Sequence, residues 1–299
     1  MMRILGIVGV QVCICVPIIV FQFCKGKEFF SKEYWGYALR IGIPIVPHYL
    51  SGIILNQGDR IMIDKMVGKT EVALYGLAYS IGMLVQLFIS GMNSALTPWM
   101  YSKIKKGDIR SMRKVLQLLS IVVVGIAVAL MLISPEMVLI FGSPKYREAV
   151  YVIPPVAASV FFIFIYNILS MPQFYYEKTQ FLMAASMAAA GANVVLNFIF
   201  IRLFGYIAAG YTTLACYMLY SVGHYIVSKR ILVNEGIQEN LMSPGFLVAC
   251  SVFLIGASII CNLILPYRIL RYAILLASAG LVFWKKELLQ KTMADIRKK

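Results

Sequence analysis

Charged residues are scarce in this sequence, and acidic residues are the scarcest. Only 14% of the residues are charged, with 13 Asp+Glu against 28 Lys+Arg, whereas 61% are hydrophobic. In a soluble globular domain roughly a quarter of the residues are charged and about half are apolar. With a mean hydropathy of +0.81, this composition excludes an ordinary soluble domain.

Residues that usually carry enzyme chemistry are also few. The sequence has 2 histidines, and it contains no P-loop, no GxSxG motif and no zinc signature. Its 6 cysteines show no CxxC or Cys/His spacing. The acidic residues of the loops are scattered singly: Asp108, Glu136, Glu177, Glu235 and Glu239. These patterns indicate no enzyme, metal or cofactor, so we expect none.

Long hydrophobic runs dominate what is present. They are about 20 residues long, the length that a helix needs to cross a hydrocarbon core of ~30 Å. Because lipid offers no hydrogen-bond partners to the backbone, runs of this kind indicate helices. We therefore predict an all-α integral membrane protein with about nine transmembrane helices, at residues 4–24, 38–67, 72–98, 115–134, 150–171, 181–202, 206–228, 246–265 and 269–284.

The excess of positive charge follows the connections between these helices. Lysines and arginines concentrate in alternate loops, at 25–36, 99–114 and 229–245, and in the tail 285–299. Loops with such an excess lie in the cytoplasm, so we predict a cytoplasmic C-terminus and, with nine crossings, an N-terminus outside. The excess positive charge then sets the orientation of the protein in the membrane. We expect membrane lipids as its partner and no nucleic acid.

Ionisable residues inside the predicted helix 38–67 are the clearest sign of function. An ionisable group at the bilayer centre costs at least ~2.5–3.5 kcal/mol and usually faces a wet cavity or the inside of the bundle. Asp59 and Arg60 lie roughly 12 Å below the turn at Gly68–Glu71. If that turn lies at the membrane surface, both residues are within the hydrocarbon zone. As neighbours they diverge by about 100° and do not pair well with each other.

Two interpretations fit this helix. Polar or small residues recur every four positions and form one stripe: His48, Gly52, Asn56 and Arg60. Such a stripe favours a cavity between helices. Alternatively, Arg60 forms a structural ion pair with Asp64, one turn later, and His48 is a satisfied core histidine.

A second polar stripe follows the predicted helix 72–98. Its members recur at steps of four and three: Tyr75, Tyr79, Gly82, Gln86, Ser90, Asn93 and Thr97. Exposing a polar stripe of this length to lipid costs free energy. We therefore expect it to face either a cavity or hydrogen-bonding partners on neighbouring helices. The small residues that precede Asn193 and Asn197 favour close helix packing instead.

Three longer segments carry a recognisable order of motifs: GDRIMIDKMVGKTEVALYGLAYSIGML, ISPEMVLIFGSPKYREAV and GANVVLNFIFIRLFGYIAAGYTTLACYML. Together they resemble the C-terminal half of the bacterial oligosaccharide and polysaccharide flippases, from about Tyr37 to Tyr225. The resemblance implies the fold of the multidrug/oligosaccharidyl-lipid/polysaccharide exporter superfamily. In that fold two six-helix lobes face each other around a central cavity, often followed by two extra helices.

On this resemblance the chain divides into three parts. Residues 1–36 form a leading transmembrane helix and a cytoplasmic loop, and residues 37–228 form the six-helix C-terminal transporter lobe. Residues 229–299 form two extra helices and a basic cytoplasmic tail. Five N-terminal helices of the family pattern are missing. We therefore expect one lobe of a two-lobe flippase-type transporter, truncated from a longer chain and lacking its N-terminal lobe.

The resemblance also implies a function in polysaccharide biosynthesis. Such proteins flip an undecaprenyl pyrophosphate-linked oligosaccharide across the bacterial inner membrane by alternating access. The pyrophosphate would be bound by Arg60, with Arg40 and His48 as further candidates, because a guanidinium carries both charge and hydrogen bonds to phosphate oxygens. Asp59 and Asp64 would balance Arg60 or bind a coupling cation.

Sugar hydroxyls would find their partners on the polar stripes, with Asn56, Tyr79, Gln86 and Asn93 as substrate-binding candidates. Two other functions stay open. A cation-coupled drug or small-molecule antiporter of the same superfamily needs a titrating acidic residue, which Asp59 or Asp64 would supply. The other is a non-transporting fragment or assembly protein.

Overall fold

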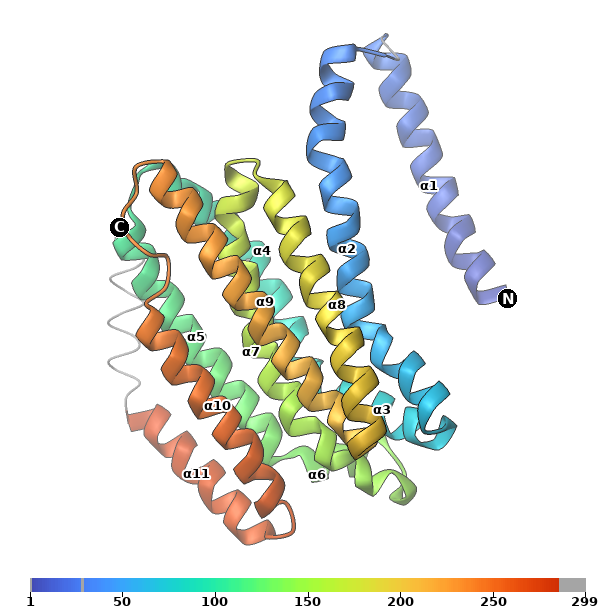
Figure 1. Ribbon diagram of the computed structural model, residues 1–299, viewed down its shortest axis with the longest axis vertical. Helices are drawn as coiled ribbons and strands as arrows, with labels where there is room; N and C mark the ends of the chain where they lie inside the picture. The colour runs from blue at the N-terminus through green and yellow to red at the C-terminus, as the bar shows by residue number, and fades with distance from the viewer. Residues whose placement is uncertain (1, 28–29, 285–299) are drawn as a thin grey trace. The chain divides into compact units, whose positions relative to one another are not determined.

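The computed structural model describes residues 2–27 and 30–284, and within these ranges the chain consists of helices and turns without a strand (Figure 1). This confirms the all-α prediction. The chain divides into two compact units, Met1–Ile43 and Pro44–Lys299. The predicted basic tail 285–299 lies outside the described residues.

The first unit contains helix α1 (Met2–Gly26) and the start of α2 (Lys32–Met66). From Leu5 onward, every side chain of α1 is exposed, although nearly all of them are apolar. A helix that is apolar on all sides and covered by no protein is typical of a membrane span.

The second unit continues from Pro44 of α2 into a bundle of helices. The elements that follow α2 are α3 (Lys69–Gly82), α4 (Leu84–Lys105), α5 (Ile109–Leu132), α6 (Ser134–Phe141), the 3₁₀ helix η1 (Pro144–Val152), α7 (Ile153–Tyr175), α8 (Thr179–Phe204), α9 (Ile207–Asn234), α10 (Pro244–Ile264) and α11 (Arg268–Trp284).

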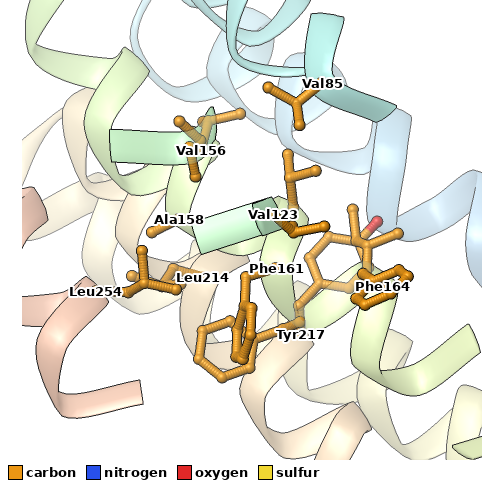
Figure 2. Close-up of a cluster of buried hydrophobic side chains, with 14 of the residues drawn as sticks. Val85, Val123, Val156, Ala158, Phe161, Phe164, Leu214, Tyr217 and Leu254 are labelled. Atoms are coloured by element: carbon orange, nitrogen blue, oxygen red, sulfur yellow. The ribbon is translucent and has the colours of Figure 1, made fainter. Parts of the chain in front are cut away.

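Helix α7 is the centre of this bundle. Its sequence IPPVAASVFFIFIYNIL is apolar on every face, and nearly all of it is buried, as expected for a helix without a polar side. It packs against α4, α5, α9 and α10 (Figure 1). Figure 2 shows part of the resulting core, where Phe161 of α7 lies in one cluster with Val123 of α5 and Leu214 of α9.

Within the described chain, seven helical segments are long and apolar enough to cross a membrane, with α3 and α4 counted as one segment and η1 and α7 as another. They account for seven of the nine predicted spans, and the other two coincide with α9 and α11. Helix α11 has only 17 residues, and polar side chains interrupt α9. These two helices therefore rest on the sequence prediction alone as membrane spans.

The predicted single helix at 72–98 is two helices, α3 and α4, which meet at Met83. The break lies where α3 approaches α7 closely. A Cβ added to Gly82 would lie 2.6 Å from Cγ1 of Val156, so only a glycine fits there. The break divides the second polar stripe, which consequently faces more than one environment.

Candidate functional site

Asp59 is buried in the middle of α2, on the face that points into the bundle. The buried residues of this stretch are Leu55, Asp59 and Ile63, and their spacing of four puts them on one side of the helix. Asp59 itself is 0% exposed. Leu55 and Ile63 therefore pack α2 against the bundle, and the Asp59 carboxylate, on the same face of the helix, is buried together with them.

Three neutral side chains from three other helices hydrogen-bond to the Asp59 carboxylate. The hydroxyl of Tyr75 on α3 donates to Oδ2 at 2.5 Å, and the hydroxyl of Thr213 on α9 donates to the same oxygen at 2.7 Å. The amide of Asn197 on α8 donates to Oδ1 at 2.5 Å. Four helices therefore meet at one carboxylate.

A second layer of polar groups holds Asn197 in place. Its amide nitrogen also donates to Oδ1 of Asn193 at 3.1 Å, and its Oδ1 accepts a short hydrogen bond from the hydroxyl of Thr212. We call Asp59, Tyr75, Asn193, Asn197, Thr212 and Thr213 the Asp59 cluster. No basic side chain of the described chain pairs with its carboxylate, whereas a buried charge normally has a partner of opposite sign.

Arg60 points to a different environment from Asp59. Its guanidinium carbon lies 5.3 Å from the centre of the Tyr79 ring, and its Nη1 reaches Oε1 of Gln57 at 3.4 Å. Asp64 is exposed, and within the described residues it forms no ion pair with Arg60. The alternative of a structural Arg60–Asp64 pair is therefore wrong, because the guanidinium turns onto an aromatic ring of the neighbouring helix.

A cavity of about 660 Å³ lies beside the Asp59 cluster, between α2, α3, α4, α7 and α9. Its lining is rich in hydroxyl, amide and aromatic groups. The lining residues are His48, Tyr49, Gly52, Ile53, Leu55, Asn56, Gln57, Tyr79, Met83, Gln86, Tyr166, Asn167, Ser170, Phe174, Tyr217 and Tyr220.

Hydrogen bonds fix the polar side chains on the α2 wall of this cavity. The hydroxyls of Tyr79 and Tyr217 both donate to Oδ1 of Asn56, at 2.7 and 3.4 Å. The ring nitrogen Nδ1 of His48 lies 3.1 Å from the hydroxyl of Tyr220. Asn56 and His48 thereby join α2 to α9 across the cavity, with α3 joined through Tyr79.

Tyrosine rings form the opposite wall. Tyr166 of α7 lies 4.5 Å from Tyr220 between ring centres, and it is nearly parallel to Tyr217, with 8° between the ring planes. Behind them, the buried side chains of Gln173 and His224 bond to each other at 2.8 Å. The wall is therefore a packed aromatic surface with hydroxyl groups at its edge.

Of the predicted substrate-binding residues, four line the cavity: His48, Asn56, Tyr79 and Gln86. Asn93 does not line it; this residue is half-buried on α4, where its carbonyl accepts the Thr97 hydroxyl. Arg40 is an exposed residue of the first unit. The structure thus brings part of the predicted set together.

Sequence reasoning missed the contribution of α7 and α9 to the cavity. Thr213, Tyr217 and Tyr220 follow each other at steps of four and three, which is the same signal that revealed the stripe on 72–98. The small residues before Asn193 and Asn197 predict a packing helix, but these two asparagines also organise the Asp59 carboxylate. Tyr166 and Asn167 sit in an apolar run without periodicity, so no pattern marks them.

The fold and these side chains define a class of protein: an all-helical, multi-span membrane protein with a buried carboxylate next to a polar cavity. Comparison with known proteins adds the family. Residues 4–105 match the polysaccharide biosynthesis protein family, in agreement with the family resemblance of the sequence.

Two relatives from Haemophilus influenzae are similar to this chain. A protein of the Lsg locus is 28% identical over 172 residues, covering 54% of this chain and 41% of the relative. An uncharacterized membrane protein is 29% identical over 191 residues, covering 60% of this chain and 46% of the relative. The matched region is less than half the length of either relative. No solved structure matches the chain significantly.

Proposed function

We propose that this chain forms one lobe of a transporter that flips a lipid-linked oligosaccharide across the bacterial inner membrane by alternating access. The observation that carries the proposal is the cavity, whose tyrosine rings and amide groups stand beside the guanidinium of Arg60. A sugar ring has apolar faces and hydroxyl edges. Tyrosine and amide side chains offer both kinds of contact.

Arg60 is proposed to meet the pyrophosphate of the lipid carrier. In the described chain its guanidinium makes one long hydrogen bond and lies over a tyrosine ring, so most of its donors remain for phosphate oxygens. Arginine suits this role because its planar fork combines charge with paired hydrogen bonds.

The test is the substitution Arg60→Ala in the full-length transporter, expressed in cells that export a surface polysaccharide. We expect export to be lost while the amount of protein in the membrane stays normal. Arg202→Ala is the matched control, because this arginine lies over the Phe198 ring at the end of α8, away from the cavity lining. Unchanged export in Arg60→Ala would remove Arg60 from the mechanism.

A cation-coupled antiporter is the second candidate, and the Asp59 cluster favours it. A buried carboxylate without a basic partner is stabilised when a proton or a metal cation binds to it. We propose that Asp59 is the coupling residue in either kind of transporter. Asp64 is a weaker candidate because it is exposed.

The substitution Asp59→Asn keeps the shape of the side chain and removes its charge. In proteoliposomes we expect Asp59→Asn to abolish the dependence of transport on a proton or sodium gradient. The cargo then separates the two functions, since loss of drug efflux in cells indicates an antiporter and loss of polysaccharide indicates a flippase. Unchanged gradient dependence would exclude Asp59 from coupling.

A further inference from the structure

The cavity is polar but carries almost no charge. Among the described residues that line it, none is an aspartate, glutamate, lysine or arginine. The lining is drawn from α2, α3, α4, α7 and α9, so its neutrality is not the property of one helix face. This composition bears on the chemical class of cargo that the proposed transporter would carry.

The charges nearest to the cavity are held at its margin. Asp59 is buried and turned toward its three hydrogen-bond donors. Arg60 lies over the ring of Tyr79 and reaches Gln57, and both of these residues line the same end of the cavity. No aspartate, glutamate, lysine or arginine lines the described wall formed by Tyr166, Tyr217 and Tyr220.

On the basis of the function proposed above, we infer that the cavity selects an uncharged sugar unit. The negative charge of the cargo would then reside in its phosphate linkage, at the Arg60 end. Hydroxyl and acetamido groups find donors and acceptors on the lining, for example on Gln57 and Gln86. A sugar carboxylate would lose water without gaining a cation, which is strongly unfavourable.

The polar groups of the lining are also preorganised for neutral hydrogen bonding. Oδ1 of Asn56 accepts hydrogen bonds from two tyrosines, and its Nδ2 donates to the carbonyl of Gly52 at 2.7 Å. The Tyr79 and Tyr217 rings are therefore held in position before a ligand arrives. Rigid aromatic surfaces favour ring stacking, which does not depend on charge.

The inference is tested by measuring the binding of two soluble disaccharides to the purified full chain in lipid nanodiscs. One is a neutral N-acetylated disaccharide, and the other has the same size but carries one uronate carboxylate. The measurement is made at about pH 8, above the ordinary histidine pKa of ~6.5, so that His48 adds no charge of its own. We expect the neutral disaccharide to bind at least tenfold more tightly.

The substitution Gln57→Lys places a cation on the lining and should bring the uronate disaccharide to within about threefold of the neutral one. Ser94→Lys is the matched control, because Ser94 is exposed on α4 and does not line the cavity; it should leave the preference unchanged. Equal or tighter binding of the uronate disaccharide to the unsubstituted protein would overturn the inference while leaving the proposed function standing. If neither disaccharide binds, both are contradicted.

Discussion

At the scale of single residues, the Asp59 cluster balances two opposing effects. Taking a carboxylate out of water costs several kcal/mol. Each hydrogen bond to a charged group contributes about 1.5–3 kcal/mol, and Asp59 accepts three from neutral donors. The two effects are of similar size, so each donor is needed, and a bound cation would add to the stability of the cluster.

The substitution Tyr75→Phe tests this balance. It removes one donor from Asp59 and leaves the ring in place, so we expect the free energy of unfolding to fall by about 1.5–3 kcal/mol. The measurement is chemical unfolding of the purified protein in mixed micelles. Tyr101→Phe, whose ring contacts Tyr175 outside the Asp59 cluster, serves as the control. An equal loss in both variants would contradict the account.

Residue spacing in the sequence could identify Asp59 but not its partners. The donors Asn197 and Thr213 lie 138 and 154 positions further along the chain, where no local periodicity connects them to Asp59. Local spacing was misleading for Arg60, since a partner one turn away on the same helix was available in Asp64. The ring of Tyr79 lies across a helix contact, and the guanidinium packs there instead.

At the scale of helices, close packing between α3 and α7 depends on Gly82. Because its added Cβ would lie 2.6 Å from Val156 Cγ1 and 3.5 Å from the backbone nitrogen of Ala157, Gly82→Ala forces the helices apart. We expect a loss of about 1–3 kcal/mol in the free energy of unfolding. Gly91→Ala on α4, where the added Cβ meets nothing within 4 Å, should be neutral or slightly stabilising. Thermal unfolding of the two variants compares them directly.

An ion pair between a buried arginine and a half-buried glutamate connects α11 to α6, and the same arginine also bonds to α5. Arg271 is only 3% exposed, and it donates to both carboxylate oxygens of Glu136, at 2.8 and 2.9 Å, and to the carbonyl of Leu132 at 2.5 Å. Tyr272 adds a bond to Glu136 at 2.9 Å. The hydrogen bonds from Arg271 lower the pKa of Glu136 below its ordinary value of 4.5.

This ion pair predicts a pH dependence of stability. Because the pKa of Glu136 is lowered in the folded protein, its contribution is fully present above pH 4.5 and is lost as the pH falls through the lowered value. At neutral pH we expect Glu136→Gln to reduce the free energy of unfolding by about 1–3 kcal/mol. Between pH 7 and pH 3 the variant should lose less stability than the unsubstituted protein. Parallel curves would show that the ion pair contributes nothing.

The hydrophobic runs predicted these helices well, but not their breaks. A run of apolar residues fixes where a helix crosses lipid, and α7 follows this rule along its whole length. The division at Met83 lies next to a close contact between Gly82 and Val156 of a different helix. The order of residues within the hydrophobic run does not reveal such a contact with another helix.

At the scale of the whole molecule, the arrangement of the loops depends on whether α9 crosses the membrane. Its polar side chains include Thr213, Ser221 and His224, and they face other helices because all three are buried. Among them, Thr213 belongs to the Asp59 cluster, and His224 bonds to Gln173 behind the tyrosine wall of the cavity. We predict that α9 spans the membrane.

Accessibility of two loop positions tests this prediction. Ser143 and Gln238 are both exposed, and helices α7, α8 and α9 lie between them. If all three cross, Ser143→Cys should react with an impermeant thiol reagent from outside and Gln238→Cys only from the cytoplasm. Reaction of both from one side would mean that one of the three helices does not cross. The expected orientation is the one predicted from the distribution of basic residues among the loops.

The central claim is that a wet, polar cavity lies inside a membrane-embedded bundle. It is tested most directly by thiol labelling of two neighbouring residues on α4 in a cysteine-free background. Gln86 lines the cavity, whereas the side chain of Leu87 is 76% exposed on the outer surface of the bundle, where lipid would cover it. We predict that Gln86→Cys reacts rapidly with a small water-soluble reagent and that Leu87→Cys does not. Rapid reaction of Leu87→Cys with an unreactive Gln86→Cys would contradict the account.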